Sequence, residues 1–297
     1  MPPDPEESWT VGRLLVATRD YLQKKGSESA RLDAEVLLAS VLACKRVELY
    51  TRYDVNVSDR QRAGLRELVK QRAEGAPVAY LVGKKEFYSM ALTVSPAVLI
   101  PRPDSEFVVV EALGRLKGVV GPRVVDVGTG SGCLALAIAH QHKSAIVIAI
   151  DISPEALEVA RGNAKTLGLA DRVTFREGDL LAPVAGEGPF DAIVSNPPYI
   201  ATGEIEGLDP GVARYEPRLA LDGGADGLRV VDRLVVQALP LLKAGGDLIL
   251  EIGSDQEKPV RSLIEGHPEL VPSPTVRDAA NHPRVIRATR KASHHGG

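Results

Sequence analysis

A short turn carries the most distinctive chemistry in this sequence. Asn196, Pro197, Pro198 and Tyr199 follow the apolar run 192–194 after a single serine, Ser195. The run predicts a buried strand, and the two prolines end it because each fixes φ and lacks an N–H. Ligands of open α/β sheets bind at such strand ends. We therefore expect an amide and an aromatic side chain beside a ligand.

Asn196 offers an amide oxygen as acceptor and an NH₂ group as donor. Its oxygen and the Pro197 carbonyl can together accept both protons of a substrate –NH₂ whose lone pair is delocalised, as in an amide or an adenine. Two such acceptors favour a pyramidal nitrogen and aim its lone pair at a methyl carbon, which is catalysis by positioning and electrostatics. Tyr199 offers a ring for stacking. The tetrapeptide alone would equally fit an ordinary turn with a core tyrosine.

A glycine loop precedes this turn in the sequence and follows an earlier predicted strand; it consists of Gly128, Thr129, Gly130, Ser131 and Gly132. A strand, a glycine loop and a helix in this order let backbone N–H groups and a helix N-terminus approach a ligand. The dinucleotide fingerprint would place its third glycine at position 133, so the match to it is imperfect. Taken alone, the loop would also fit a tight turn with close helix packing.

An acidic residue ends the next predicted strand, and another follows the strand after it. Asp151 lies roughly 20 residues beyond the glycine loop, where a carboxylate accepts hydrogen bonds from ribose hydroxyls; it could also cap the helix that starts near Pro154. Asp179 could accept from an adenine amino group, with Leu180 packing on the ring, although Gly-Asp after a strand is usually only a turn. Because no P-loop lysine follows the glycines, S-adenosylmethionine fits better than a dinucleotide or a triphosphate. Its methyl group is already activated, so no metal is expected.

The whole-chain composition narrows the class of protein. The chain has 297 residues, is 44% hydrophobic and 25% charged, and carries a net charge of -3. This balance is typical of a globular protein and gives no global basic field for nucleic acid. Cys44 and Cys133 are too few for a disulfide framework, and no Cys/His spacing suggests zinc. The start MPPDPEES lacks the features of a signal or transit peptide, and no apolar run spans a membrane, so we expect a cytoplasmic protein. His294 and His295 fit a solvated tail better than a metal site.

Residues 1–77 predict a small helical domain. The helical segments are expected after Thr10, at Ala30–Ala43, and from the capping box at Ser58 to Gly75. The last of these helices has a basic face, either a solvated surface or a contact for an acidic or RNA-bearing partner: Arg60, Arg62, Arg66, Lys70 and Arg72. Residues 78–100 predict a connector, with a hairpin of Phe87–Val94 and Ala97–Ile100 broken at Ser95-Pro96.

Residues 101–297 alternate β-rich and helical segments, which predicts a parallel, doubly wound, Rossmann-like α/β sheet. Helices are expected near Cys133, Pro154, Gly227 and Gln256. The predicted strands are Arg123–Val127, Ala145–Asp151, Arg172–Arg176, Asp191–Ser195, Asp247–Ile252 and Arg284–Thr289.

The order of the glycine loop, Asp151 and Asn196-Pro-Pro-Tyr199 resembles class I S-adenosylmethionine-dependent methyltransferases that modify planar amino groups. Further stretches are similar to the HemK family, which methylates the glutamine of the Gly-Gly-Gln loop in peptide chain release factors. They are LIPRPDSE (Leu99–Glu106), YEPRLALDGGADGL (Tyr215–Leu228), LILEIG (Leu248–Gly253) and RDAANHPRVIRA (Arg277–Ala288).

The resemblance implies cofactor contacts at Gly128–Gly132, Asp151, Leu180 and Asn196, and contacts to the substrate glutamine at residues 196–199. It also implies release factors as protein partners of the N-terminal domain, and S-adenosylhomocysteine as the other product. Position 180 is often aromatic in the family, so Leu180 should stack more weakly. The segment DAANHPR departs from the usual DLAGRDR, and no role is assigned to Asn281 and His282.

Three other functions share parts of this pattern. A ribosomal-protein glutamine methyltransferase would share the turn but is expected to differ in its N-terminal region. An adenine-N(6) nucleic-acid methyltransferase would need a target-recognition region and a basic cleft, which the net charge of -3 disfavours. A non-catalytic nucleoside-binding scaffold would not need paired acceptors at Asn196.

Overall fold

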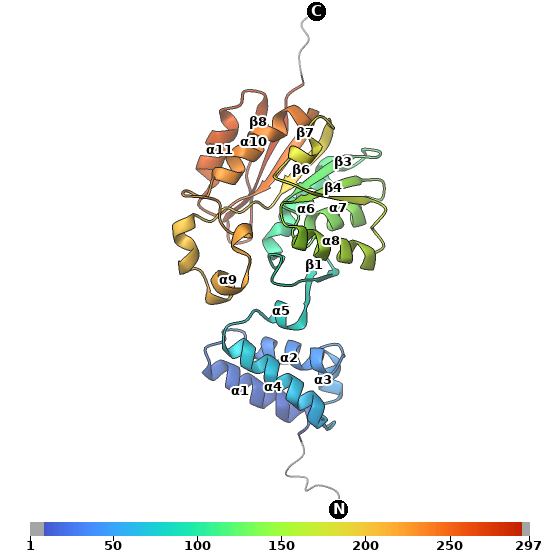
Figure 1. The fold of residues 1–297 in the computed structure, drawn as a ribbon, viewed down its shortest axis with the longest axis vertical. Helices are drawn as coiled ribbons and strands as arrows, with labels where there is room; N and C mark the ends of the chain where they lie inside the picture. Colours follow the sequence, from blue (N-terminus) through green and yellow to red (C-terminus); the bar gives the residue numbers. More distant parts are fainter. Residues whose placement is uncertain (1–8, 293–297) are drawn as a thin grey trace, which may run out of the picture. The chain divides into compact units, whose positions relative to one another are not determined.

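The computed structural model describes residues 9–292, which form two compact units (Figure 1). The first unit extends to Lys84 and takes in Pro210–Tyr215; the second holds Lys85–Asp209 and the chain from Glu216 onward. The N-terminal octapeptide and the pair His294 and His295 lie outside the described residues. Across the described chain, no helix is long and apolar enough to cross a membrane.

The first unit is a helical bundle around a leucine-rich core. The hydroxyl of Thr10 accepts from the N–H of Arg13, and Ser58 with Gln61 forms the expected capping box. The apolar second helix contributes the fully buried Leu37 and Leu38 to the core, which confirms its central place. The helices are α1 (Val11–Lys24), α2 (Ala30–Val41), α3 (Glu48–Thr51), α4 (Asp59–Ala73), α5 (Val78–Val82) and α9 (Pro210–Tyr215).

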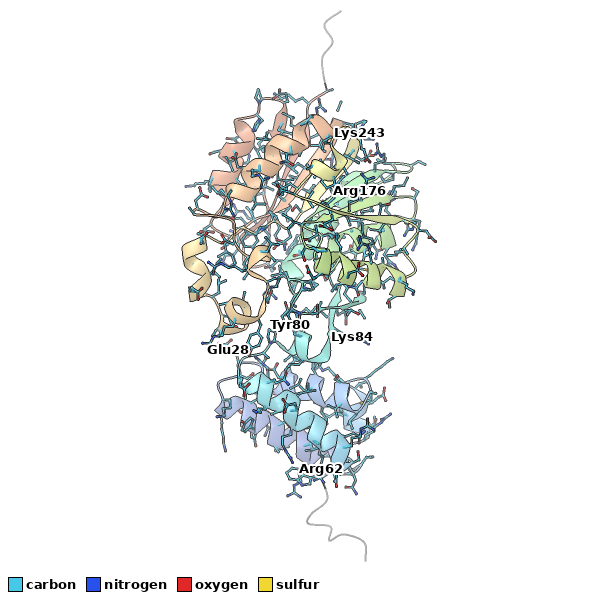
Figure 2. The ribbon with its side chains drawn as sticks, in the orientation of Figure 1. Glu28, Arg62, Tyr80, Lys84, Arg176 and Lys243 are labelled. Carbon is cyan, nitrogen blue, oxygen red and sulfur yellow. The ribbon has the colours of Figure 1, made fainter. Side chains whose placement is uncertain are left out.

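Two of the five basic residues on α4 are engaged within the bundle. Arg62 (Figure 2) forms an ion pair with Asp59 in the first turn of its own helix. Arg72 donates through Nε to the buried carboxylate of Asp33 at 2.7 Å. The expectation that Arg72 belongs to a solvent face is therefore wrong, because it neutralises a carboxylate that the bundle buries.

The hairpin between residues 78 and 100 is present, but its predicted pairing is wrong. The paired strands are β1 (Lys84–Phe87) and β2 (Met90–Thr93). Tyr88 and Ser89 make the tight turn with φ of 48° and 60°. Residues 97–100 form no strand.

The second unit contains one mixed sheet, with order β5-β4-β3-β6-β7-β10-β8 and β9 paired to β10. β3 to β7 are parallel, whereas β10 runs antiparallel to β7, β8 and β9. The expectation of a parallel sheet thus holds for five strands and is wrong beyond β7. The strands are β3 (Arg123–Val127), β4 (Ile146–Asp151), β5 (Val173–Glu177), β6 (Phe190–Ser195), β7 (Leu242–Glu251), β8 (Leu270–Pro272), β9 (Val276–Arg277) and β10 (Pro283–Arg290).

Helices cover both faces of this sheet (Figure 1). Consecutive residues of β3 point to opposite faces, so Val124 joins the core under α6 and α7, and Val125 joins the core under α10 and α11. This packing confirms the doubly wound architecture. The helices are α6 (Glu106–Leu116), α7 (Cys133–Gln141), α8 (Pro154–Thr166), α10 (Arg229–Leu241) and α11 (Glu257–Glu265).

The two ends of the parallel strands differ in chemistry. At the amino ends of β6 and β7, Lys243 (Figure 2) forms an ion pair with Asp191. At the carboxyl ends, β3 lies between β4 and β6, and the chain order reverses there. This reversal is the topological switch point at which open α/β sheets bind ligands.

Candidate active site

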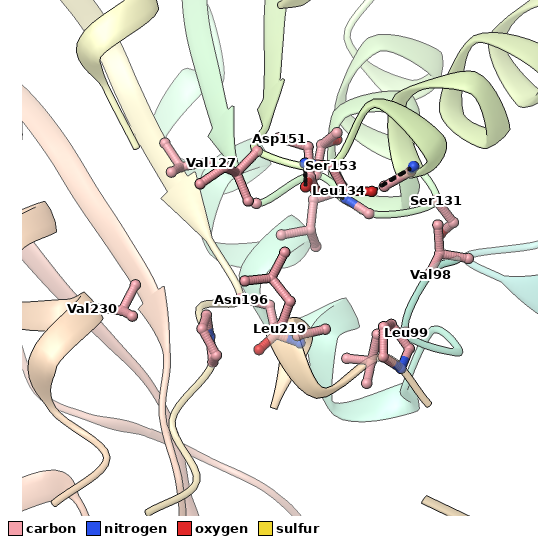
Figure 3. Close-up of a pocket in the computed structure, with 18 of the residues that line it drawn as sticks. Val98, Leu99, Val127, Ser131, Leu134, Asp151, Ser153, Asn196, Leu219 and Val230 are labelled. Carbon is pink, nitrogen blue, oxygen red and sulfur yellow. Dashed lines mark hydrogen bonds between the residues drawn. The ribbon is translucent and has the colours of Figure 1, made fainter. Parts of the chain in front are cut away.

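A cavity of about 450 Å³ opens at the carboxyl ends of β3, β4 and β6 (Figure 3), within the size range of small-molecule sites. Asp151 and Asn196 are among its polar groups, and Val98, Leu99 and Leu219 are among its apolar ones. The lining comes from segments 97–105 and 217–222, the loops after β3 to β6, and the start of α10.

Strand register brings the predicted site residues to one level. Val127 is paired with Ile150 on one side and with Ser195 on the other. The next residue along each strand is therefore Gly128, Asp151 or Asn196, and all three line the cavity. Residues far apart in sequence converge here because parallel strands end at the same edge of the sheet.

Glycine is required at the three loop positions for different structural reasons. Gly128 and Gly130 have φ of 70° and 54°, and a Cβ on either would meet open space. Gly132 has φ of 84°, and its Cβ would press on Leu136 and Ala160. Gly128, Thr129, Gly130 and Ser131 line the cavity, whereas Gly132 does not. Gly132 therefore permits close helix packing, and the other two glycines leave the loop surface bare for a ligand.

The loop uses much of its hydrogen-bonding capacity within the protein. The N–H groups of Gly128 and Thr129 both donate to the Ile150 carbonyl, and Gly130 donates to the Asp151 carboxylate at 2.8 Å. The other Asp151 oxygen accepts from the Ser153 N–H at 3.0 Å. The Ile152 N–H also acts on this carboxylate, which has about four acceptor sites and so retains one for a ligand hydroxyl. Asp151 thus both shapes the loop and presents an acceptor to the cavity.

Asp126 supports the loop from below. Its carboxyl group is fully buried and accepts from the Thr129 hydroxyl at 2.6 Å and from the Ala135 N–H at 3.1 Å. Burial raises the pKa of this group to about 7. These contacts connect the glycine loop to the first turn of α7. Thr129 is therefore fixed by its hydroxyl, which bonds Asp126, and by its N–H, which bonds the Ile150 carbonyl.

Asp179 and Leu180 lie on the cavity wall after β5. The Asp179 carboxylate forms an ion pair with Arg233 of α10, which the sequence did not predict. Leu180 adopts φ of 50° and packs against the core under α10. An adenine amino group would therefore share Asp179 with a guanidinium.

The Asn-Pro-Pro-Tyr turn divides its residues between the cavity and the protein. Asn196 and Pro198 line the cavity; Pro197 and Tyr199 do not. The Asn196 Nδ2 donates to the buried Ser105 hydroxyl oxygen at 3.0 Å. The Tyr199 phenol donates to Glu251 Oε1 at 3.5 Å, and its backbone carbonyl accepts from Gln256 at 2.8 Å. The tyrosine ring thus faces a buried carboxyl group at the end of β7.

Several residues that line the cavity were not predicted from the sequence. Arg102 pairs with the buried Glu216 at 2.6 Å, and the Ile100 N–H donates to the same carboxylate. This joins the stretch LIPRPDSE to YEPRLALDGG, and Leu99 and Leu219 line the cavity beside the joint. Both stretches were conspicuous in the sequence, but nothing in their spacing indicated that they meet.

Asn281 and His282 belong to a turn that closes on Asp278. The His282 N–H donates to the Asp278 carboxylate at 2.9 Å, and Asn281 adopts φ of 66°. Within the described chain, no group of three or more His, Cys, Asp or Glu residues could hold a metal ion. The absence of a metal remains a prediction.

Models of two protein families match the chain. The first, described as the PrmC N-terminal domain, matches residues 13–83. The second, described as the Methyltransferase small domain, matches residues 108–208 and includes the glycine loop, Asp151 and Asn196.

Curated relatives cover most of the chain. The chain is 44% identical to the release factor glutamine methyltransferase of Rhodopirellula baltica over 94% of its length and 95% of the relative's. It is 46% identical to the protein of the same name from Geobacter sulfurreducens, over 87% of this chain and 89% of that one. Among solved structures, the hMettl16 catalytic domain in complex with MAT2A 3'UTR hairpin 1 matches with a TM-score of 0.58 at 15% identity. That alignment covers 93% of this chain and 92% of the other, and it shows the fold alone.

Proposed function

The chain belongs to the release factor glutamine methyltransferase family, and we propose that it methylates the side-chain amide nitrogen of the glutamine in the Gly-Gly-Gln loop of peptide chain release factors. S-adenosylmethionine is the methyl donor and S-adenosylhomocysteine the product. The observation that carries the proposal is the meeting of Asp151, the bare glycine loop and Asn196 around one cavity.

The cavity residues fit S-adenosylmethionine. Asp151 would accept from the ribose hydroxyls, and the open space before Gly128 and Gly130 would let the ligand approach the backbone. Asp179 and Leu180 would hold the adenine. When bound there, S-adenosylmethionine supplies a methyl group already activated by its sulfonium.

Asn196 and the Pro197 carbonyl would hold the substrate amide. Its nitrogen lone pair is delocalised, so two acceptors on its N–H groups favour the geometry that attacks a methyl carbon. The amide nitrogen would gain an N–C bond while the S–C bond of the donor breaks, and one of the two amide protons would pass to water. Tyr199 would support the turn on which both acceptors stand, and Pro198 would contribute to the cavity wall beside them.

The first unit would recognise the protein substrate. Each predicted cofactor contact lies in the second unit, and the first has a hydrophobic core of its own. We assign residues 1–77 to recognition, 78–100 to a connector and 101–297 to methyl transfer.

The acceptor decides the proposal. Purified protein is incubated with methyl-labelled S-adenosylmethionine and, separately, a release factor, a ribosomal-protein extract and DNA. Label on the release factor glutamine is the expected result. A release factor whose Gly-Gly-Gln glutamine is replaced by alanine serves as the matched control. Label on a ribosomal protein or on adenine instead would overturn the substrate assignment.

A further inference from the structure

A serine and a buried glutamate stand behind Asn196. Ser105 ends the short turn Pro103–Ser105, and Glu251 ends β7 in the stretch LILEIG. Both are nearly inaccessible, at 1% and 2% exposed. Ser105 lines the cavity, whereas Glu251 does not.

The contact between Asn196 and Ser105 leaves one question open. A hydroxyl can donate to an amide oxygen or accept from an amide nitrogen, so Ser105 alone would tolerate either orientation of the Asn196 amide. Only one orientation turns the Asn196 oxygen toward a substrate N–H. A third group must therefore decide which way the hydroxyl hydrogen of Ser105 points.

Glu251 can determine the direction in which the Ser105 hydroxyl hydrogen points. The Ser105 side chain lowers the pKa of its carboxyl group, which places the hydroxyl within reach as a donor, and the Tyr199 phenol donates to Oε1 at 3.5 Å. Oε2 is buried and has no hydrogen-bond partner in the described part of the chain, so this oxygen can accept from the Ser105 hydroxyl. A carboxylate accepts only, so an ionised Glu251 draws the Ser105 hydrogen and leaves the serine oxygen to accept from Asn196.

Resting on the proposed function, we propose that Ser105 and Glu251 are positioning residues that fix the Asn196 amide with its oxygen toward the substrate. Arg284 supports them, since it bridges Asp278 at 2.9 Å and Asp104, the neighbour of Ser105, at 3.2 Å. This places the late stretch RDAANHPR, through Arg284, in the support of the same turn.

The charge of Glu251 sets a pH dependence. Burial raises its pKa to about 7; Asp104 acts in the same direction, whereas Ser105, Arg284 and Tyr199 lower it. Below that pH, the neutral carboxyl group can donate to Ser105, whose own hydrogen then turns to Asn196. The amide would flip and offer its NH₂ to the substrate. Methyl transfer should therefore fall as pH drops through about 7.

Single-turnover methyl transfer at saturating S-adenosylmethionine and release factor tests the proposal. Ser105→Ala should lower the rate about tenfold, the value of one neutral hydrogen bond, with unchanged cofactor affinity by calorimetry. Ser105→Thr keeps the hydroxyl and should restore much of the rate. In an Asn196→Ala background, Ser105→Ala should cause no further loss, because both changes act through the same amide.

Glu251→Gln tests the charge. Its NH₂ imitates the protonated acid, so the rate should be low and nearly independent of pH from 6 to 8, while the wild type shows an acid limb near 7. Asp247→Asn is the matched control, since it removes another buried carboxylate of β7 that pairs with Arg115 and Arg287. It should lower stability and keep the acid limb. An unchanged limb in Glu251→Gln, or additive losses from Ser105→Ala and Asn196→Ala, would overturn the positioning roles. A normal rate in Asn196→Ala alone would instead overturn the proposed function.

Discussion

The backbone N–H of Gly130 donates to the carboxylate of Asp151 at 2.8 Å and joins the loop after β3 to the end of β4. The residue predicted to bind the ribose thus also shapes the loop beside it. Its side chain is largely buried, and burial raises its pKa, which backbone N–H bonds from Ser153, Gly130 and Ile152 oppose. Loss of this carboxylate should affect ligand binding in two ways.

Asp151→Ala should weaken S-adenosylmethionine binding by roughly 1.5–3 kcal/mol, the value of a hydrogen bond to a charged group. Because the freed Gly130 N–H loosens the loop, we expect the upper part of that range. Calorimetric titration measures it directly. Asp171→Ala, an exposed change before β5, is the control and should bind normally. Equal affinities for the two variants would exclude Asp151 as the ribose ligand.

Much of this site was predictable because its residues follow strands with strong sequence signals. Gly128 and Asp151 directly follow apolar strand residues, and Asn196 follows an apolar run after Ser195 alone. The parallel register of the strands then brings the three residues together. The predicted strand pairing of the hairpin was wrong because its strands are short and the turn at Tyr88 and Ser89 has positive φ without a glycine. Propensity gives no warning of such a turn.

The support behind the site was not predictable. Ser105, Glu251 and Arg284 are separated by long stretches of chain, and only the antiparallel addition of β10 beside β7 brings the last two together. The sequence alternation favoured a parallel sheet throughout. Contacts between charged residues of distant segments, such as Arg102 with Glu216, leave no periodic signal.

Acid should destabilise the first unit through Glu35. Burial would raise the pKa of this carboxyl, but hydrogen bonds from Tyr50, Arg46 and Arg31 bring it to about 2, below its ordinary 4.5. A depressed pKa stabilises the fold above about 4.5, and that contribution is lost as pH falls toward 2. Solvent screens the two exposed arginines, so Glu35→Gln should cost about 1–2 kcal/mol near neutral pH.

Trp9 is the only tryptophan and packs on the core of this unit, so its fluorescence reports the unfolding. Urea titrations of wild type and Glu35→Gln at several pH values measure the difference. The two should converge near pH 2. A difference that stays constant with pH would show that the charge of Glu35 does not act as proposed.

Removal of the first unit should separate recognition from cofactor binding. A chain that starts at Lys85 loses the first unit apart from α9 and keeps each cavity residue, and we expect it to bind S-adenosylmethionine with normal affinity. It should methylate intact release factor poorly, because the surface assigned to recognition is gone. Cofactor binding by calorimetry is the internal control for folding. Full activity on intact release factor would deny the first unit a role in recognition.

Asn196 gives the sharpest test of the chemistry. Asn196→Ala removes the acceptor that orients the substrate amide, and turnover should fall by a factor on the order of 10²–10³, as when a key electrostatic group is lost. Asn196→Asp keeps the acceptor oxygens, one of which can accept from the Ser105 hydroxyl. It loses the NH₂ donor and adds a charge beside the sulfonium, so it should retain measurable activity.

Cofactor affinity should change less than turnover in both variants, since Asp151 and the glycine loop hold the nucleoside. Single-turnover methyl transfer at saturating cofactor and release factor measures the chemical step, and calorimetry measures the affinity. If the acceptor oxygen is essential, the rate of methyl transfer should decrease in the order wild type, Asn196→Asp, Asn196→Ala. If the Ala variant transferred methyl at the wild-type rate, Asn196 would be an ordinary turn residue, and the lone pair of the substrate amide would have to be oriented by other groups.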